Sequence, residues 1–122
     1  MKEHIGLAGL GLNGSFVSLW DNKADGDASC VRILEGAGVV VFARTTQPQT
    51  IMHLETENNL YGVTVNPYNS DLTAGGSSGG EGALVGIRGS CLGVGSDVGG
   101  NVVLLLLLLG AFLLGFGCLL FC

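Results

Sequence analysis

The feature that most constrains the fold of this chain is a glycine-rich stretch over residues 75–100. Eleven of its twenty-six residues are glycine. Glycine reaches backbone conformations closed to other residues, and its missing side chain lets other groups approach the main chain, but it weakens regular helices and strands. The stretch therefore predicts a shaped backbone segment against which other parts of the chain pack.

The charged residues bound the class of protein. The chain has 122 residues, enough for one small domain. Only 12% of them are charged, against about 25% in an ordinary soluble domain, and none follows Asp97. The five basic residues are scattered and the net charge is -5. Because phosphate binding needs clustered Lys and Arg, we expect no nucleic-acid partner.

The periodicity of apolar residues predicts short alternating elements. Two apolar runs, at 16–20 and 39–43, are typical of buried strands. Between them a helix is expected over 27–36, with Asp27 as its N-cap and with Val31 and Leu34 on one face. A turn at 66–69, a second helix at 82–89 and a strand at 92–96 complete the expected elements. Helix alternating with strand indicates the α/β class.

The last 21 residues, 102–122, carry no charge and include six consecutive leucines. We expect a long apolar helix from about residue 102. As a helix this segment would be about 31 Å long, enough for the roughly 30 Å hydrocarbon core of a bilayer. Two interpretations stay open, a C-terminal membrane anchor and a mis-translated segment. The chain is thus expected to divide into a domain at 1–100 and a tail at 101–122. We expect it in the cytoplasm, with membrane anchoring through the tail as the open alternative.

Metal and cofactor sites have little support in the sequence. His4 and His53 are isolated from other metal-ligating residues, and the four cysteines form no C-x-x-C pair. The GLGLNG motif at 9–14 has the spacing of a dinucleotide fingerprint. It lacks a clear helix after it and a placed acidic partner for the ribose. We therefore expect no metal and no cofactor.

Two glycine-rich motifs carry a resemblance to a known family. GGSSGGEGAL at 75–84 and RGSCLGVGSDVGG at 88–100 resemble the pattern of the amidase signature family, and TTQPQ at 45–49 and NPYN at 66–69 add to it. The resemblance covers residues 14–100, a small part of that family's catalytic domain. It implies amide-bond hydrolysis by a Ser–cis-Ser–Lys triad without a metal. The expected fold is a fragment of the amidase signature α/β fold, an incomplete mixed sheet with covering helices, followed by the apolar C-terminal helix.

The resemblance also implies roles for individual residues. Ser77 takes the position of the bridging cis-serine. Val98, Gly99 and Gly100 supply backbone amides to the oxyanion hole, where preorganised N–H groups stabilise developing negative charge. Ile51 approaches the substrate pocket.

Two positions depart from the family pattern. Asn101 stands where the nucleophilic serine is due, and asparagine has no hydroxyl with which to form an acyl-enzyme. In the SLWDN motif at 18–22, Trp20 stands where the catalytic lysine is due, and its indole offers no basic lone pair.

The function expected from the sequence is therefore that of an amide-hydrolase fragment, catalytically inactive as it stands, with a small amide as substrate if active. Two alternatives stay open: a small tail-anchored membrane protein that carries a degenerate amidase segment, and an active amidase if the gene product continues past Gly100. The sequence leaves the oligomeric state open.

Overall fold

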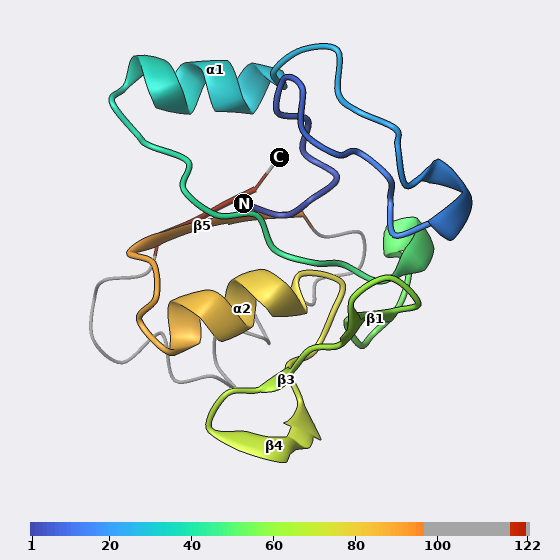
Figure 1. The fold of residues 1–122 in the computed structure, drawn as a ribbon. Coiled ribbons are helices and arrows are strands. Elements are labelled where there is room, and N and C mark those ends of the chain that lie inside the picture. Colours follow the sequence, from blue (N-terminus) through green and yellow to red (C-terminus); the bar gives the residue numbers. More distant parts are fainter. Residues whose placement is uncertain (97–117, 122) are drawn as a thin grey trace.

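The computed structural model describes residues 1–96 and 118–121; residues 97–117 and 122 lie outside the described part. Figure 1 shows helix α1 on one side of the N-terminal segment and strand β5, and helix α2 on the other. The elements follow in the order η1 (Val17–Leu19), α1 (Ser29–Gly36), η2 (Gln49–Ile51), β1 (Glu57–Asn58), β2 (Gly62–Val63), β3 (Val65–Asn66), β4 (Asn69–Thr73), α2 (Gly79–Gly86), β5 (Leu92–Gly95) and β6 (Cys118–Phe121). The mixed α/β class is confirmed.

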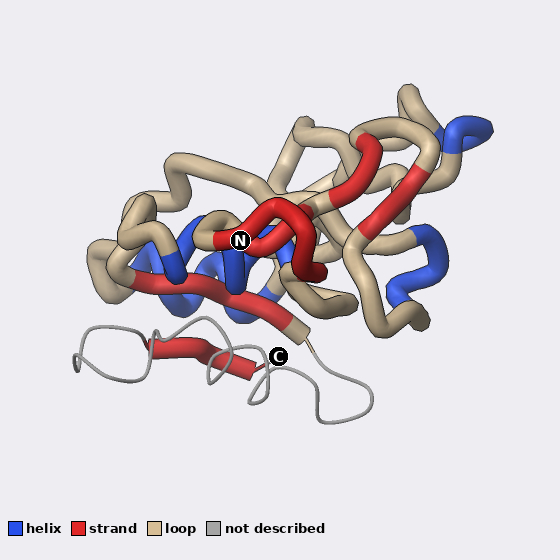
Figure 2. Tube along the Cα trace, turned by 90° about the horizontal axis from the view of Figure 1, so that it is seen from below, coloured by secondary structure: helices blue, strands red, loops and turns tan. Residues whose placement is uncertain are grey.

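The described strands pair in small two-stranded sheets. β1 pairs antiparallel with β2, and β3 pairs antiparallel with β4 through an irregular register. β5 pairs in parallel with β6, and the two strands run side by side in Figure 2. The N-terminal segment joins β5 from the other side, because the backbone N–H of Lys2 donates to the carbonyl of Val94 at 2.9 Å. This arrangement brings residue 2 next to the glycine-rich stretch.

The core lies where the N-terminal segment crosses α1 and β5. Its buried side chains come from the first residues of the chain, from α1 and from β5: Met1, Ile5, Leu7, Val31 and Val94. Leu34 and Val41 pack against them from the periphery. Val31 is fully buried, so the apolar face predicted for the first helix is the face that packs.

Several expected elements are confirmed. α1, α2 and β5 form close to their expected positions, and the expected turn at 66–69 joins β3 to β4. In that turn the backbone N–H of Tyr68 donates to the side chain of Asn66 at 2.9 Å. The prediction that Asp27 is the N-cap of α1 is wrong. Ala28 takes that position, and the carboxylate of Asp27 instead accepts a hydrogen bond from the backbone of Ala8 at 2.8 Å.

The strand expected at 16–20 is wrong. The backbone there turns, since Leu19 N donates to Phe16 O and Trp20 N to Val17 O, and the residues form η1. None of its residues is buried, and Val17 is 60% exposed. An apolar run becomes a strand only beside a partner strand, and none of the described residues pairs with this one.

The strand expected at 39–43 is also wrong. This segment is a loop with Val40 and Phe42 strongly exposed, although Val41 reaches the core. Pairing begins only past its end, where Thr45 forms an isolated parallel bridge with Lys2. A single bridge anchors the loop without making it a strand.

The helix expected from residue 102 is wrong where the structure describes that region, because residues 118–121 form strand β6. The rest of the expected helix lies outside the described residues. Within the described part of the chain, no helix has the length and apolar character needed to cross a membrane.

Candidate active site

The loop that carries Ser77 is shaped by close packing against residues 53–56. The peptide bond between Gly76 and Ser77 is cis, the geometry that the family resemblance implied for this serine. A Cβ atom on Gly76 would lie 2.8 Å from the carbonyl oxygen of His53, closer than real Cβ atoms approach. Only glycine fits there without a shift of backbone. The glycines before Ser77 therefore let the loop lie directly on the neighbouring segment.

The side chain of Thr56 holds the same loop in place through two hydrogen bonds. This fully buried threonine donates its hydroxyl to the carbonyl of Gly75 at 2.9 Å and accepts the backbone N–H of Gly79 at 2.9 Å. The two bonds clamp both ends of the turn that presents Ser77 and Ser78. The turn then leads into α2, whose first residue is Gly79.

The centre of the site is a buried lysine among serines. The ammonium group of Lys2 lies 2.5 Å from the hydroxyl of Ser77 and 3.2 Å from that of Ser96. It also donates to the carbonyl of Ser96 at 3.3 Å. Ser78 donates to that same carbonyl at 2.9 Å. Lys2 is 0% exposed and Ser77 8%, so water is largely excluded from the contact between them.

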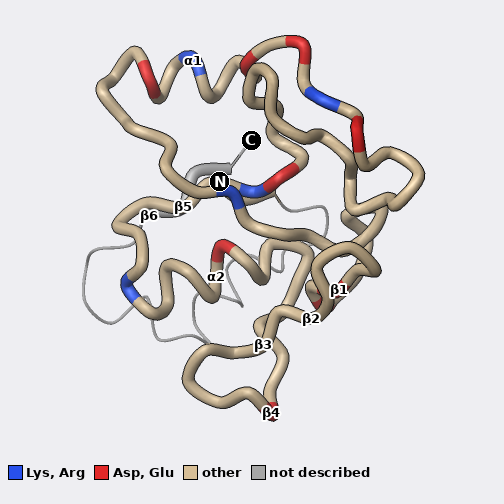
Figure 3. Tube along the Cα trace, viewed as in Figure 1, with Lys and Arg blue, Asp and Glu red and all other residues tan. Residues whose placement is uncertain are grey.

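The buried carboxylate of Glu81 ties α2 to the N-terminal segment and to β5. It accepts hydrogen bonds from the hydroxyl of Thr45 at 2.5 Å and from the backbone of Val94 at 3.0 Å, and it lies 2.7 Å from the amino group of Met1. In Figure 3 helix α2 lies next to the N-terminal segment and β5. Glu81 thus brings together the elements that carry Lys2, Ser77 and Ser96.

Glu3 and His4, the two residues after Lys2, form a polar network with Asn13 and Gln47. The carboxylate of Glu3 accepts the backbone N–H of Asn13 and the side-chain amide of Gln47, both at 2.7 Å. His4 Nδ1 lies 3.0 Å from Gln47 Oε1. Burial, together with the nearby charge of Lys2, lowers the pKa of His4. The His4 imidazole therefore stays neutral to a lower pH than an ordinary histidine does.

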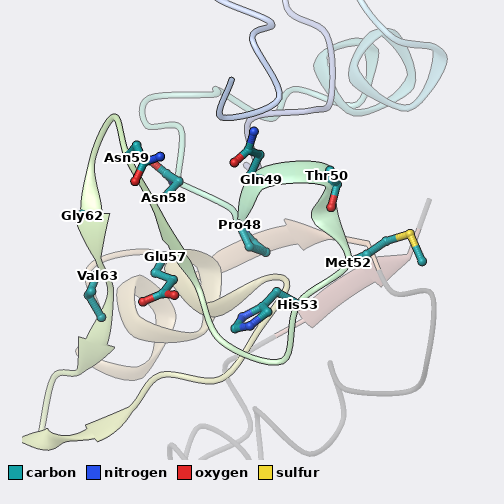
Figure 4. Close-up of a pocket in the computed structure, with 10 residues that line it drawn as sticks. All are labelled: Pro48, Gln49, Thr50, Met52, His53, Glu57, Asn58, Asn59, Gly62 and Val63. Carbon is teal, nitrogen blue, oxygen red and sulfur yellow. The ribbon is translucent and has the colours of Figure 1, made fainter. Parts of the chain in front are cut away.

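A pocket opens in the region of residues 48–63. It has a volume of about 420 Å³ and lies between η2 and the β1–β2 hairpin. In Figure 4 the side chains of His53 and Glu57 lie between the η2 loop and β2. His53, one of the lining residues, also has its backbone carbonyl against Gly76. Pro48, Met52 and Val63 add apolar surface to the lining.

The structure gives Trp20 surroundings that differ from those of Ser77. Trp20, assigned there to the lysine position, is 57% exposed and its ring contacts that of Tyr61. The ammonium group beside Ser77 belongs to Lys2. Ile51 lies in η2 between Thr50 and Met52, two residues that line the pocket.

Four other residues named from the resemblance, Val98, Gly99, Gly100 and Asn101, lie outside the described residues.

Lys2 and Ser96 were missed by the sequence reasoning. They are separated from Ser77 and Lys2 by 75 and 94 positions respectively, and no local pattern links such positions. A weak signal was present, since the chain has only two lysines and Lys2 is one of them. Among the described residues, no three His, Cys, Asp or Glu side chains gather into a set that could hold a metal ion.

Comparison with known proteins agrees with this geometry. The family model described as Amidase matches residues 1–104. A Schizosaccharomyces pombe protein named as an amidase is 53% identical over 102 residues, and the acetamidase of Emericella nidulans is 47% identical over 103 residues. Each alignment covers 84% of this chain and 19% of the relative. The chain thus spans about a fifth of the length of these curated relatives.

The solved structures give the same result. A fatty acid amide hydrolase superposes with a TM-score of 0.70 and 45% identity, over 73% of this chain and 16% of that chain. A 6-aminohexanoate cyclic dimer hydrolase superposes with a TM-score of 0.64 and 33% identity, over 67% of this chain and 17% of that chain. The range matched by the family model includes Lys2, Ser77 and Ser96. The chain belongs to the Amidase family.

Proposed function

We propose that this chain carries the lysine–serine proton relay of an amide hydrolase, and that its own hydrolytic chemistry is blocked at position 101. The observation that carries the proposal is the 2.5 Å contact between Lys2 Nζ and Ser77 Oγ, made in a buried site. A hydroxyl held this close to an amine is suited to proton transfer, because a general base must lie within hydrogen-bond reach of the proton that it takes.

The relay follows from the chemistry of the two groups. An unprotonated Lys2 amine has one lone pair and accepts the proton of the Ser77 hydroxyl. The Ser77 oxygen then takes a proton from a third hydroxyl, whose oxygen attacks the carbonyl carbon of an amide. When the tetrahedral intermediate collapses, the proton returns along the same path to the leaving nitrogen. Ser96 holds Lys2 from the side, through its hydroxyl and its carbonyl.

The third hydroxyl is the missing part. By the sequence pattern of the family it belongs at position 101, where this chain has asparagine. An amide side chain cannot form an acyl-enzyme, so the relay has no nucleophile to activate. We therefore propose that the chain does not turn over amides as it stands. This absence of a hydroxyl does not disturb Lys2 and Ser77, whose contact is already formed.

An amide is the substrate class that we propose for the complete machinery. Two of the relatives carry the names acetamidase and fatty-acid amide hydrolase, and both names refer to amides. The pocket of about 420 Å³ lined by His53 and Glu57 has room for a small amide. Its lining combines apolar surface with the polar groups of His53 and Glu57, and so favours neither a purely aliphatic nor a purely charged ligand.

A fluorophosphonate probe tests the proposal, because it labels only an activated nucleophile. We expect no labelling of the natural chain and labelling at residue 101 in Asn101→Ser. The double variant Asn101→Ser/Lys2→Met should lose labelling. The matched control Asn101→Ser/Lys23→Met should keep it, since Lys23 is the other lysine and is exposed. Circular dichroism of each variant confirms that the fold is retained.

Two results would contradict the proposal. Labelling of the natural chain at Ser77 would show that Lys2 and Ser77 form a self-sufficient nucleophile and base, so that position 101 does not block the chemistry. Equal labelling of the Lys2 and Lys23 double variants would show that Lys2 plays no part in activating the hydroxyl.

A further inference from the structure

The position of Lys2 depends on the short segment that carries it, and one buried side chain grips that segment. Gln47 is fully buried and precedes Pro48 in the loop that leads to η2. Its side-chain oxygen accepts the backbone N–H of His4 at 3.2 Å, and its side-chain nitrogen donates to the carboxylate of Glu3 at 2.7 Å. The amide therefore spans the two residues that directly follow Lys2.

The orientation of this amide follows from its partners. A backbone N–H can only donate and a carboxylate can only accept, so the oxygen of Gln47 must face His4 and its nitrogen must face Glu3. The same oxygen lies 3.0 Å from His4 Nδ1, which must then carry the proton of the neutral imidazole. No flipped amide satisfies these contacts, so the side chain has one orientation.

Gln47 is itself held firmly. Its backbone carbonyl accepts the hydroxyl of Ser15 at 2.8 Å and the side-chain amide of Asn58 at 2.7 Å. Both bonds come from other segments of the chain. The side chain of Gln47 thus projects from an anchored backbone, and its grip on the segment after Lys2 is a grip from a fixed point.

A tight turn links this grip to the active site. Lys2 opens the turn, since the backbone N–H of Ile5 donates to the carbonyl of Lys2 at 3.1 Å, and Glu3 and His4 are its central residues. The side chain of Lys2 contacts Ser77, while that of Glu3 contacts Gln47. On one flank the backbone N–H of Lys2 is bonded to Val94 in β5. On the other, Gln47 holds the side chain of Glu3 and the backbone of His4.

We propose that Gln47 is a positioning residue for the relay, which sets the place of the Lys2 amine relative to Ser77 through Glu3 and His4. This inference rests on the proposed function for its catalytic meaning. It concerns a side chain whose described hydrogen bonds go to Glu3 and His4. Its effect on the relay is therefore indirect, through the backbone.

Exchange of the side chains at positions 3 and 47 offers a sharp test. Gln47→Glu is nearly isosteric but places a carboxylate against that of Glu3, so the donor is lost and two like charges meet in a buried site. The double variant Glu3→Gln/Gln47→Glu exchanges the two groups and restores every bond. The new Gln at position 3 accepts from Asn13 and donates to position 47, whose carboxylate accepts from His4.

The readout is the environment of Lys2 itself. Since the chain has two lysines, labelling with ε-¹³C-lysine gives two NMR signals, and exposed Lys23 serves as an internal reference. We expect Gln47→Glu to move the Lys2 signal toward that of Lys23. The exchanged double variant should return the Lys2 signal to its natural position. Gln49→Met, an exposed glutamine two residues away, should leave both signals unchanged.

The rate of fluorophosphonate labelling connects this test to the proposed proton relay. In the Asn101→Ser background, the rate of fluorophosphonate labelling should fall about 10- to 100-fold with Gln47→Glu, as expected for a displaced catalytic group, and recover in the exchanged variant. A purely stabilising role would lower the melting temperature and leave the Lys2 signal of the folded protein in place.

Three outcomes decide the matter. A folded Gln47→Glu variant with a natural Lys2 signal overturns the proposal. An exchanged variant that fails to fold, or folds with a displaced Lys2 signal, also overturns it, even if Gln47→Glu alone does not fold. Absence of labelling in every variant, with the expected NMR pattern intact, refutes the proposed relay and leaves the positioning of Lys2 by Gln47 standing.

Discussion

Replacement of Gly79 by alanine perturbs the loop of Ser77 at its tightest contact. Gly79 is the first residue of α2, and a Cβ atom there would lie 2.4 Å from Thr56 Oγ1 and 2.9 Å from Thr56 Cβ. Thr56 has no room to retreat, because it is fully buried and its hydroxyl bonds to both Gly75 and Gly79 at 2.9 Å. The added methyl group must therefore displace either the helix start or the threonine.

The expected cost combines two effects. Forcing one extra methyl group into a filled site costs about 1–3 kcal/mol. Loss of the Gly79–Thr56 hydrogen bond adds about 1 kcal/mol. Alanine regains up to about 1 kcal/mol over glycine in a helix, though less at its first residue. We therefore expect Gly79→Ala to lower the free energy of unfolding by about 2 kcal/mol, and the melting temperature by about 8 °C for a chain of this size.

Thermal unfolding followed by circular dichroism measures this loss. Gly26→Ala is the matched control, since nothing lies within 4 Å of a Cβ atom on Gly26, and we expect its melting temperature to stay within about 2 °C of the natural chain. If Gly79→Ala melted together with Gly26→Ala, the close approach of the loop to Thr56 would not exist in solution, and the clamped geometry of Ser77 would lose its basis.

Three further predictions concern the network around the site. The pKa of His4 is lowered from 6.5 in the folded chain, so the unfolded chain binds more protons below that pH; stability should be full above about pH 6.5 and fall as the pH decreases, as urea unfolding would show. His4→Asn should flatten this dependence and His53→Gln, at an exposed site, should not; an unchanged slope in His4→Asn would contradict the assignment. Glu81→Leu should destabilise the chain by about 3 kcal/mol or more, since it leaves buried donors without an acceptor, and a melting temperature equal to that of the natural chain would refute this. Val31→Ala at a fully buried position should cost about 2 kcal/mol and Ile33→Ala, 72% exposed, under about 1 kcal/mol; equal melting points for the two would argue against α1 packing through Val31.

The local elements could largely be predicted from the sequence. α1 forms where apolar spacing and the glycines after it place it, α2 begins three residues before its expected start at residue 82, and β5 follows the expected run. These elements depend on neighbouring residues, and their signals lie within a few positions. The two wrong strands, at 16–20 and 39–43, show the limit of that reasoning. An apolar run signals burial, but whether it becomes a strand depends on a partner elsewhere in the chain.

The candidate site could be predicted only in part. Ser77 was found because its motif is contiguous, from GGSS to the glycines that follow. The lysine was sought near residue 20 by local motif, and the structure places Trp20 at the surface instead. Lys2 comes into contact with Ser77 because its own backbone bonds to β5, and the backbones of Met1 and Glu3 on either side of it bond to Thr45.

The sequence by itself determined the family, the glycine-rich loop with its serine, and the asparagine at position 101. Each of these depends on residue types at fixed neighbouring positions. Only the tertiary structure decided which cation meets that serine, and which side chain holds the cation in place. Lys2, Gln47 and Ser77 belong to three segments whose approach is set by backbone hydrogen bonds and buried carboxylates. Such contacts form between distant residues, and no spacing along a single segment encodes them.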